Sequence, residues 1–575
     1  MTFVEKRTDV LVIGGGIAGI RAAIEASESG ADVILTNKGA FCKDGAAAWM
    51  AGNGFQAALY SPDSVETHVM DTIKGGWYLN NQTLVKTFLA LGLKTVADMN
   101  KWGVRLAKKD NRFYQLPFPG HSFPRSVCGK PGLFLGPEYR KTLYRQIKKR
   151  KIRVKEDFFV VDLLVCDDAV GGVIGLDLRN GTIEVYRAKS TVLATGGFMG
   201  CYNFTTANPT ATGDGHAMAY RAGVKMMDME FVQFIPAAHL WPPNARGDIY
   251  PYMLWINLHP HFYNNLGERF LERYYPEKKE WVTREAAARA IVSEVRAGRG
   301  SPHGGAYMSF RHLPVNLIDN FLEKSAGVHY FEKLKDAGLD IRHDAIEVAP
   351  GAHYVQGGCW INERCETSLK RLYAVGEAGS GGKDGADRLA GNSITFCLAM
   401  GLIAGREAAE RARELRLPDI NKADVERLSQ HIMSPLKAMK GKRPLEVKKK
   451  VQEILSTHAM LGRDKAGLTA ALEQLKQIRE KEIPAMATVA KHKSFNLDWL
   501  DALEARNMLD VAEIVCTPAL MRTETRGLHE RIDFPKADPG WLKHIIINKV
   551  GDEMKISTEP VDLCIVQPEK EAQIG

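Results

Sequence analysis

The distribution of apolar residues predicts short buried strands in the first two thirds of the chain and amphipathic helices after about residue 417. Asp9 to Ile13, DVLVI, is almost entirely apolar and β-branched, which is typical of a parallel strand that is buried on both faces. After a run of glycines, RAAIEASESG contains good helix formers and ends at Gly30, and ADVILTN predicts a second strand. The chain therefore begins with a strand, a glycine turn, a helix and a strand.

Two later segments repeat the pattern of a short apolar strand that ends in glycine. TVLATGG at 191–197 is followed by a loop and a helix in NPTATGDGHAMAYRAGV, and RLYAVGEAGSGG precedes the helical segment GNSITFCLAMGLIAGREAAERA. We therefore expect strands from distant parts of the chain to form one nucleotide-binding domain, residues 1–235 plus 350–416. The segment 236–349 is rich in Pro, Tyr, Trp and His and is expected to be an insertion.

The last third of the chain predicts a different architecture. RLSQHIMSPLKAM, LEVKKKVQEILSTHAML and GLTAALEQLKQIREKEIPAMATV carry apolar residues three and four positions apart with charged opposite faces, which predicts a helical domain at 417–535. WLKHIIINKV and MKISTEPVDL predict short strands in the remaining residues, 536–575. No period of about 20 to 50 residues recurs, so a solenoid is not expected.

The glycine turn at 14–19, GGGIAG, lies between a strand and a helix, and this context turns a weak pattern into a specific one. Glycine permits a tight turn and lets a pyrophosphate reach backbone N–H groups at a helix amino end, where the helix dipole favours negative charge. The second strand ends at Thr36-Asn37-Lys38 instead of in the usual ribose-binding carboxylate. Asn37 is a candidate for a ribose hydrogen bond, and Lys38 suits a phosphate.

Charge and cysteine content narrow the class of protein. The net charge is +9, but the basic residues are spread along the chain, and the densest runs, RQIKKRKIRVK and KAMKGKRPLEVKKK, lack the interleaved aromatic residues of a single-strand binder. Solvated faces are the better interpretation, attraction of an anionic substrate is the second, and no nucleic acid is expected. The nine cysteines form no CxxC pair and no ferredoxin-like run, which argues against an iron-sulfur cluster within this chain.

The chain contains no segment that predicts secretion or membrane insertion. Its first nine residues are too short and too polar for a signal peptide, and no apolar run approaches the about 18 residues of a membrane span. We therefore expect a cytoplasmic protein that reaches the cytoplasmic face of a membrane only through a partner.

Eight segments, in order along the chain, carry a resemblance to a known family. They are VIGGGIAGIRAA, LATGG, TGDGHAMAYRAG, MEFVQF, GAHYVQGG, LYAVGEA, RLAGNS and RTETRGLHER. Over almost its whole length the chain resembles the flavoprotein subunits of the succinate dehydrogenase and fumarate reductase family and their L-aspartate oxidase and adenylylsulfate reductase relatives. The resemblance implies an α/β fold in which a Rossmann-like FAD-binding domain carries an inserted α+β capping domain, followed by a helical domain and a short C-terminal segment.

The resemblance also implies a bound FAD. The family's contacts carry over onto Gly14, Gly16, Ala18 and Gly19 at the pyrophosphate, Lys38 near the ribose, Ala47, Ala48 and Gly52 along the isoalloxazine, and Asp214, Glu377, Asn392 and Ser393. In many respiratory members a histidine of the second glycine loop is bonded covalently to the flavin, and the matching position here is Ala47. Alanine cannot form that bond, so we expect noncovalent FAD.

Three residues match the positions that carry the family's chemistry. Hydride passes between flavin N5 and a substrate carbon while an arginine moves the proton, and that arginine matches Arg284 in VTREAAARAI; the alternative is an exposed helix arginine paired with Glu280 or Glu285. His353 in GAHYVQGG and Arg388 in DRLAGNS match the pair that binds the substrate carboxylate. An arginine fork and a charge-assisted histidine donor suit that task, although a packing role is the alternative for His353.

Two departures from the family pattern concern the other end of the substrate. Phe234-Ile235-Pro236 replaces the family's F-H-P, and AAHLWPPNARGDIYPYMLWINLHPHFYNN lacks the family's threonine-glutamate stretch. The candidates for a new lining, each with packing as an equal alternative, are His239, Arg246, Tyr252, Trp255, His259 and His261. His259 and His261 lack nearby third and fourth ligands, so no metal is expected.

The resemblance implies an FAD-dependent oxidoreductase that acts on a CH–CH bond of an anionic carboxylate or acyl substrate and exchanges electrons with an iron-sulfur protein subunit. Fumarate and succinate themselves remain alternative substrates, although the departures favour a larger or less anionic enoate. Three further possibilities are an adenylylsulfate-reductase-like flavoprotein, a stand-alone enzyme of the L-aspartate oxidase type, and a flavin-binding subunit without turnover of its own.

Overall fold

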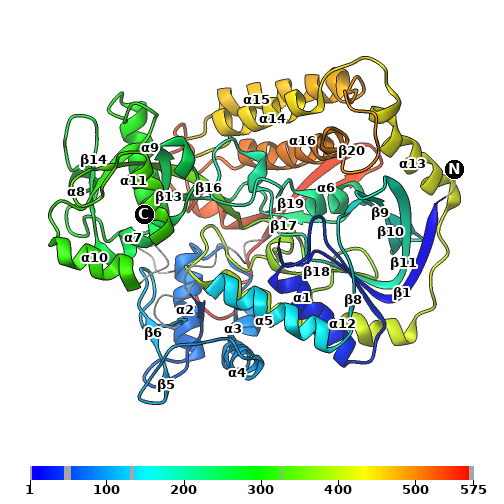
Figure 1. Ribbon diagram of the computed structural model, residues 1–575, viewed down its shortest axis with the longest axis horizontal. Coiled ribbons are helices and arrows are strands. Elements are labelled where there is room, and N and C mark those ends of the chain that lie inside the picture. Colours follow the sequence, from blue (N-terminus) through cyan, green and yellow to red (C-terminus); the bar gives the residue numbers. More distant parts are fainter. Residues whose placement is uncertain (1–2, 44–53, 130–134, 325–327, 569–575) are drawn as a thin grey trace.

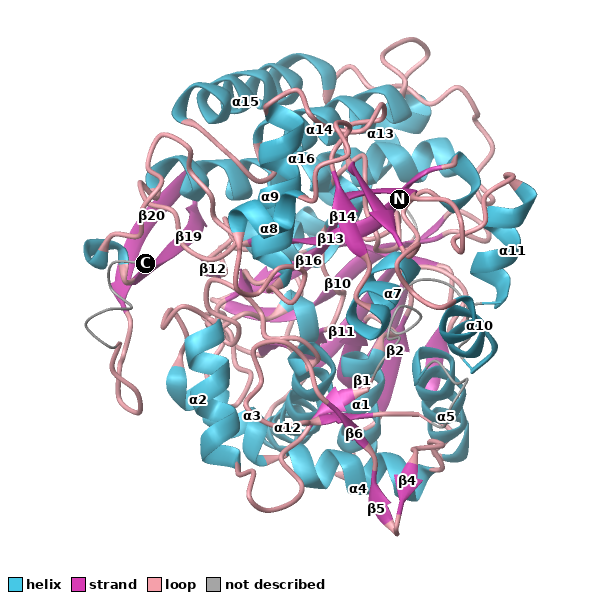
Figure 2. Ribbon diagram, turned by 90° about the vertical axis from the view of Figure 1, so that its left-hand side faces the viewer, coloured by secondary structure: helices cyan, strands magenta, loops and turns pink. Residues whose placement is uncertain are grey.

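A computed structural model of the chain describes residues 3–43, 54–129, 135–324 and 328–568 (Figure 1). Its elements form one main body, which holds both ends of the described chain, and a capping lobe built from the middle of the sequence (Figures 1 and 2).

A seven-stranded sheet forms the centre of the main body. Its strand order is β8-β2-β1-β11-β10-β9, and β18 pairs in parallel with the carboxyl-terminal half of β11. The strands are β1 (Val4–Ile13), β2 (Val33–Thr36), β8 (Arg153–Lys155), β9 (Phe158–Cys166), β10 (Ala169–Asp177), β11 (Thr182–Leu193) and β18 (Leu372–Ala374). The pairing of β1 and β18 with the same strand confirms the prediction that distant segments share one sheet.

Helix α1 (Ile17–Glu28) lies against this sheet and is covered in turn by α12 (Asn392–Glu414). The two helices cross closely, since a Cβ at Gly405 would lie 2.3 Å from the carbonyl oxygen of Ala22. The helices of the main body that precede the capping lobe also include α2 (Val65–Gly75), α3 (Gln82–Ala90), α4 (Gly92–Trp102), α5 (Leu135–Lys149) and α6 (Asp214–Arg221). Short strands β3 (Phe55–Gln56), β7 (Ser126–Val127) and β6 (Gln115–Leu116) form a small sheet, and β4 (Lys108–Lys109) pairs with β5 (Arg112–Phe113).

The capping lobe, green in Figure 1, is built on a four-stranded sheet in the order β13-β16-β15-β14. Its elements are β13 (Val232–Trp241), α7 (Tyr250–Leu258), β14 (His261–Tyr263), α8 (Phe270–Tyr274), α9 (Arg284–Arg296), β15 (Ala306–Ser309), α10 (Val315–Lys324), α11 (Val328–Asp336) and β16 (Ile346–Val355). The chain enters and leaves through paired strands, because Val232 lies opposite Val355. A hydrophobic core separate from that of the main sheet extends from Ile235 to Val348.

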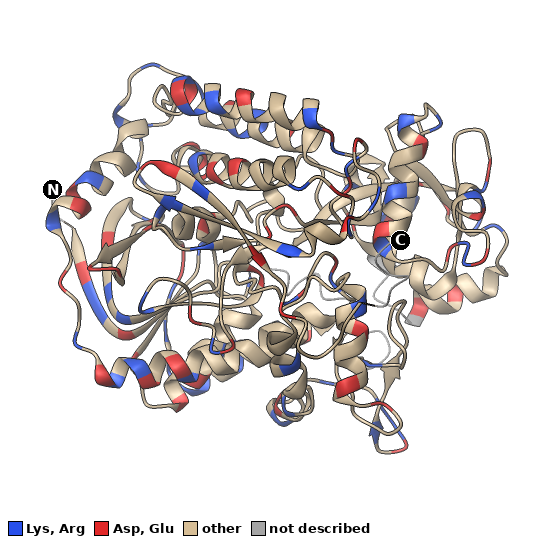
Figure 3. Cartoon of the chain, turned by 180° about the vertical axis from the view of Figure 1, so that it is seen from behind, with Lys and Arg blue, Asp and Glu red and all other residues tan. Residues whose placement is uncertain are grey.

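The predicted helices of the last third are α13 (Lys422–Lys437), α14 (Pro444–His458), α15 (Lys465–Gln477) and α16 (Leu497–Met521). Figure 3 shows Lys and Arg interspersed with Asp and Glu along the helices. Lys440, Lys442 and Lys449 of the second basic run are exposed, which agrees with its interpretation as a solvated face. Among the described residues, no helix combines the length and the apolar character needed to cross a membrane.

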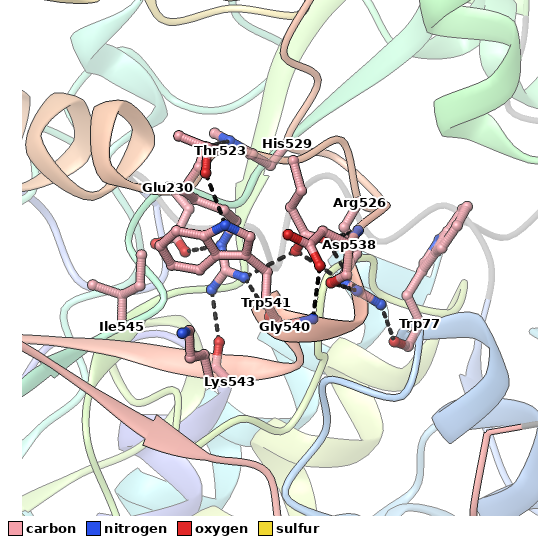
Figure 4. A network of polar contacts seen from close by, with 12 residues as sticks. Trp77, Glu230, Thr523, Arg526, His529, Asp538, Gly540, Trp541, Lys543 and Ile545 are labelled. Atoms are coloured by element: carbon pink, nitrogen blue, oxygen red, sulfur yellow. Dashed lines mark hydrogen bonds and ion pairs between the residues drawn. The ribbon is translucent and has the colours of Figure 1, made fainter. Parts of the chain in front are cut away.

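The C-terminal segment is held to the main body by a buried polar network (Figure 4). Arg522 pairs with Glu230 at 2.7 Å, both side chains are fully buried, and the same guanidinium donates to the carbonyl oxygen of Lys543. Arg526 donates to the carbonyl oxygen of Trp77, which precedes it by 449 positions. Removing one partner of a buried ion pair costs about 3–5 kcal/mol, so this segment is integral to the fold. It ends in the hairpin β19 (Lys543–Val550) and β20 (Glu553–Pro560), which joins β12 (Met226–Met227) and β17 (Gly358–Cys359) in a sheet.

Candidate active site

A cavity of about 570 Å³ runs from the glycine turn after β1 to the capping lobe. One end is lined by the turn at 14–18, by the start of β9 and by the loop 206–214. The other end is lined by residues of β13, α7, α9 and β16 and by the segment that leads into α12. The cavity therefore lies where the sheet of the main body meets the inserted lobe, a common position for ligand sites.

The glycine turn presents backbone to the cavity. Gly14 has φ +111°, and a Cβ there would lie 2.3 Å from the carbonyl oxygen of Ala194, so the turn requires glycine at this position. Gly16 caps α1 without a side-chain hydrogen bond, and Gly14, Gly16 and Ala18 line the cavity. The first N–H groups of α1 are thus available to an anion, as the sequence predicted. Gly19 does not line the cavity; a Cβ there would lie 1.9 Å from Gly14 O, so it permits close packing within the turn.

The polar residues that follow β2 make hydrogen bonds and ion pairs within the protein. The Asn37 amide accepts the N–H of Gly15 at 3.1 Å and donates to the carbonyl oxygen of Gly39 at 2.8 Å, so it holds the glycine turn. Lys38 lines the cavity, but its ammonium group contacts Asp214 at 2.8 Å and Glu504 at 2.6 Å, and it also donates to oxygens of the loop at 210–212. An ammonium has three N–H groups, so these contacts satisfy Lys38 within the protein, and its predicted contact with FAD stays a prediction.

Two buried polar groups in the wall have no partner among the described residues, and no motif drew attention to them as ligands. Both amide atoms of Gln56, which is 1% exposed, and the hydroxyl of Thr195 make no hydrogen bond and line the cavity. Leaving such groups unpaired is costly, so they indicate a bound polar molecule. A planar amide with its donor and acceptor unpaired fits the polar edge of a flavin ring. A lone polar residue in the buried strand β3 is the sequence signal that was available for Gln56.

The remaining predicted cofactor residues divide into three groups. Asp214, Glu377 and Ser393 line the cavity, and burial raises the pKa of Glu377 to about 7 while its carboxylate accepts the N–H of Val355 at 3.0 Å. Asn392 does not line it, because its amide is bonded to His68 and Thr72 behind the wall. Ala47, Ala48 and Gly52 lie outside the described residues, so noncovalent attachment stays a prediction.

Arg284, His353 and Arg388 come together at the capping end of the cavity. Arg284 is the first residue of α9, is only 9% exposed and donates to the carbonyl oxygen of Arg388. Glu280 is instead paired with Arg269, at 2.7 Å. The alternative of an exposed helix arginine paired with Glu280 or Glu285 is therefore wrong, because Arg284 is buried.

The two anion-binding candidates are held by neighbours. Arg388 donates to Gln233 at 2.8 Å and to Ser393 at 3.1 Å, and its guanidinium carbon lies 4.2 Å from the centre of the Tyr354 ring. His353 contacts the hydroxyl of Thr206 through Nδ1 at 2.9 Å. Burial, with smaller effects from the two arginines, lowers the pKa of His353 well below its usual value. A lowered pKa favours the neutral imidazole, so the two arginines supply the positive charge here, and the expected charge-assisted hydrogen bond from His353 to a carboxylate stays a prediction.

The rest of the lining at the capping end is mostly apolar. It includes Ile235, Ile249 and Met253 together with Tyr252, the sole member of the six lining candidates that lines this cavity. The other five lie elsewhere: His239 is bonded to Tyr330, Arg246 lies over Phe204, Trp255 donates to the Glu280 carbonyl, His259 lies beside Trp281 and His261 stacks on His312. No cluster of three metal-ligating side chains occurs in the part of the chain that the structure describes.

These features define an FAD-dependent oxidoreductase. The glycine turn between β1 and α1 lines a long cavity that contains unpaired polar groups, and the end of this cavity next to the inserted lobe is lined by two arginines. Residues 9–394 match the family model described as FAD binding domain, and residues 448–573 match that of the fumarate reductase flavoprotein C-terminal region. The chain therefore belongs to the family of succinate dehydrogenase and fumarate reductase flavoproteins.

Relatives align over nearly the full length of the chain. An uncharacterized FAD-dependent oxidoreductase of Methanocaldococcus jannaschii is 35% identical over 94% of this chain and 96% of its own. A fumarate reductase (CoM/CoB) subunit from Methanothermobacter marburgensis is 34% identical over 94% of this chain and 97% of its own. Among solved structures, a mutant FrdA of E. coli quinol fumarate reductase superposes with a TM-score of 0.91 at 27% identity, covering 99% of both chains.

Proposed function

We propose that this flavoprotein reduces or forms a carbon-carbon double bond next to a carboxylate or acyl group, and that an iron-sulfur protein exchanges electrons with it. The proposal rests above all on the convergence of Arg284, His353 and Arg388 at one end of a cavity that Ile235, Ile249 and Met253 also line. Bound FAD would supply the hydride acceptor or donor. The residues that would hold it are those of the glycine turn together with Gln56, Thr195, Asp214, Glu377 and Ser393.

The protein's own side chains have three tasks in this proposal. Arg388 grips the substrate carboxylate with its guanidinium fork, and the neutral His353 adds a hydrogen bond. Arg284, buried within reach of the same anion, gives a proton to the substrate carbon during reduction and takes it back during oxidation. Ile235 and the α7 residues exclude water from the reacting carbons.

Substrate choice follows from the asymmetry between the two ends of the site. A second carboxylate placed against Ile235, Ile249 and Met253 would lose its hydration without gaining a partner, which costs several kcal/mol, or about two orders of magnitude in affinity. We therefore expect larger monoanionic enoates or acyl thioesters to reoxidise the photoreduced flavin under anaerobic conditions. The concentration of these compounds that gives half the maximal rate should be much lower than that of fumarate. Adenylylsulfate belongs in the same panel as the competing substrate.

Ile235→His gives this prediction a direct control, because it introduces a hydrogen-bond donor at the apolar wall. The variant should improve kcat/KM for fumarate and leave the larger enoate unchanged or slightly worse. Saturation of the wild type by fumarate at low concentration, with no gain in the variant, would contradict the expected selectivity. If adenylylsulfate were the only compound of the panel to reoxidise the flavin, the proposed reaction at a carbon-carbon bond would be wrong.

The electron partner is tested by purification from the native source. One of the relatives reported above is named as a subunit of a fumarate reductase, and in this chain no CxxC pair or ferredoxin-like cysteine run is present to hold a cluster. We expect a second protein to copurify that contains iron and acid-labile sulfide in equal amounts. A homogeneous, iron-free protein that turns over with oxygen would instead identify a stand-alone oxidase.

A further inference from the structure

A second cavity, of about 270 Å³, lies behind the cationic end of the first one. It is enclosed by the end of α2, by α7, by the first residues of α9 and by the segment 387–390. Trp77, which also lines it, is held in place through its carbonyl oxygen by Arg526 (Figure 4). The cavity therefore lies between the capping lobe and the main body, next to the proposed reaction site.

Arg284 and Arg388 line both cavities, together with Tyr252 and Ala390. These residues form the wall that separates the two spaces. Arg284 is thus accessible from two sides, from the first cavity where the substrate would lie and from the second cavity behind it.

The second cavity leads from the surface to Arg284. Lys74 and Thr283 in its lining are exposed, whereas Arg284, Glu285 and Asp387 are buried. Its volume is several times the about 30 Å³ that one water molecule occupies in the liquid, and its inner lining is charged, so it suits a chain of hydrogen-bonded water.

Two carboxyl groups line this cavity: Glu285, which accepts the hydroxyl of Thr283, and Asp387, which is linked to Arg388 through Gln233. One oxygen of Asp387 accepts the Gln233 amide at 2.7 Å, and the same amide accepts from Arg388, so the side chain is fixed beside the wall. Burial raises the pKa of Asp387 well above that of a free aspartate, nearby Glu285 raises it further, and Arg284 and Arg388 act in the opposite direction. Tyr252 and Lys74 are the other titratable groups of the cavity.

We propose that the second cavity is the proton path between solvent and Arg284, and that Asp387 relays the proton. When cofactor and substrate fill the first cavity, that side of Arg284 is closed to water, so its proton has to be replaced from behind. In reduction, Arg284 loses a proton to the substrate carbon, Asp387 restores it, and solvent reprotonates Asp387; oxidation runs in reverse. The relay rests on the proposed function, and Asp387 acts through Arg284 without touching the substrate.

The central test is Asp387→Asn in the flavin-loaded protein, with Asp319→Asn as matched control. Asp319 pairs with Arg342 on the capping lobe and lines neither cavity. With the best enoate of the panel, Asp387→Asn should lower kcat by about 10²-fold at unchanged KM and flavin content. In the wild type the rate of enoate reduction should fall as pH rises, because the Asp387 carboxyl ionises. The pH profile of the variant should not show this decrease. Small carboxylic acids should restore its rate.

Ile256→Trp tests the path without altering a charge, because Ile256 lines only the second cavity. Filling this space should lower kcat and raise the solvent isotope effect, while enoate affinity stays the same. An unchanged kcat and pH profile in both variants would overturn the relay.

Infrared spectroscopy separates failure of the relay from failure of the proposed function. A protonated carboxyl band that titrates with pH and disappears in Asp387→Asn, but not in Asp319→Asn, is expected whether or not any enoate reacts. A wild type that no enoate reoxidises would refute the proposed function while this band still reported on the path. Absence of the band would refute the path itself.

Discussion

Arg284→Gln should lower the rate of flavin reoxidation by the best enoate by about 10²- to 10⁴-fold, the usual contribution of a positioned proton donor. The amide cannot give up a proton at the substrate carbon, whereas Arg388 and His353 remain to bind the carboxylate. Substrate dissociation constants, measured by perturbation of the flavin spectrum, should therefore change far less than the rate. Stopped-flow reoxidation under anaerobic conditions gives both quantities.

Two further variants make this result specific. Arg284→Lys keeps the positive charge but loses the planar fork, so it should recover only part of the rate. Lys279→Gln removes a cation from the surface of the capping lobe, where Lys279 pairs with Glu272, and should behave as the wild type. Equal loss of affinity and rate in Arg284→Gln would show that Arg284 binds the substrate and does not transfer the proton.

Gly14→Ala should yield a protein with little or no FAD. The added Cβ would lie 2.3 Å from Ala194 O, and alanine rarely adopts the φ of +111° found here. Relief of this overlap requires the glycine turn to move away from β11, which displaces the backbone N–H groups that would bind the pyrophosphate. The ratio of flavin absorbance to protein in the purified variant measures the effect.

Gly103→Ala separates the steric effect from the backbone effect. Gly103 ends α4 with a φ of +95°, but a Cβ there would have no atom within 4 Å and the residue does not line the cavity. This variant should lose on the order of 1 kcal/mol of stability and keep its FAD. Full flavin content in Gly14→Ala would show that the turn tolerates a side chain and that the cofactor is held elsewhere.

Local sequence patterns predicted the helices and strands whose conformation depends on neighbouring residues in the chain. The apolar run DVLVI, the glycine turn and the helix formers that follow predict β1 and α1, although β1 begins at Val4, five residues earlier than expected. The additional residues are extended because β11 continues alongside them, with Val4 opposite Glu184. Such pairing depends on a strand about 180 residues away and leaves no trace in the local sequence.

Residue types in motif order likewise indicated the cofactor, the family and the three residues Arg284, His353 and Arg388. A motif specifies which backbone conformation and which side chain are present, so it can be recognised without knowledge of the fold. It does not specify which partners a side chain meets. Lys38 shows this limit, because its ammonium group pairs with Asp214 and with Glu504, which comes from α16 far along the chain.

The sequence by itself thus determined the strand, turn and helix order, the class of cofactor and the chemistry of one end of the site. The tertiary structure decided which polar groups remain unpaired and which residues share a wall. Gln56 was inconspicuous in sequence until burial left its amide without a partner among the described residues, and five of the six lining candidates turned out to lie away from the cavity. Asp387 gained its significance in the same way, because burial and proximity to Arg284 are properties of packing across distant segments.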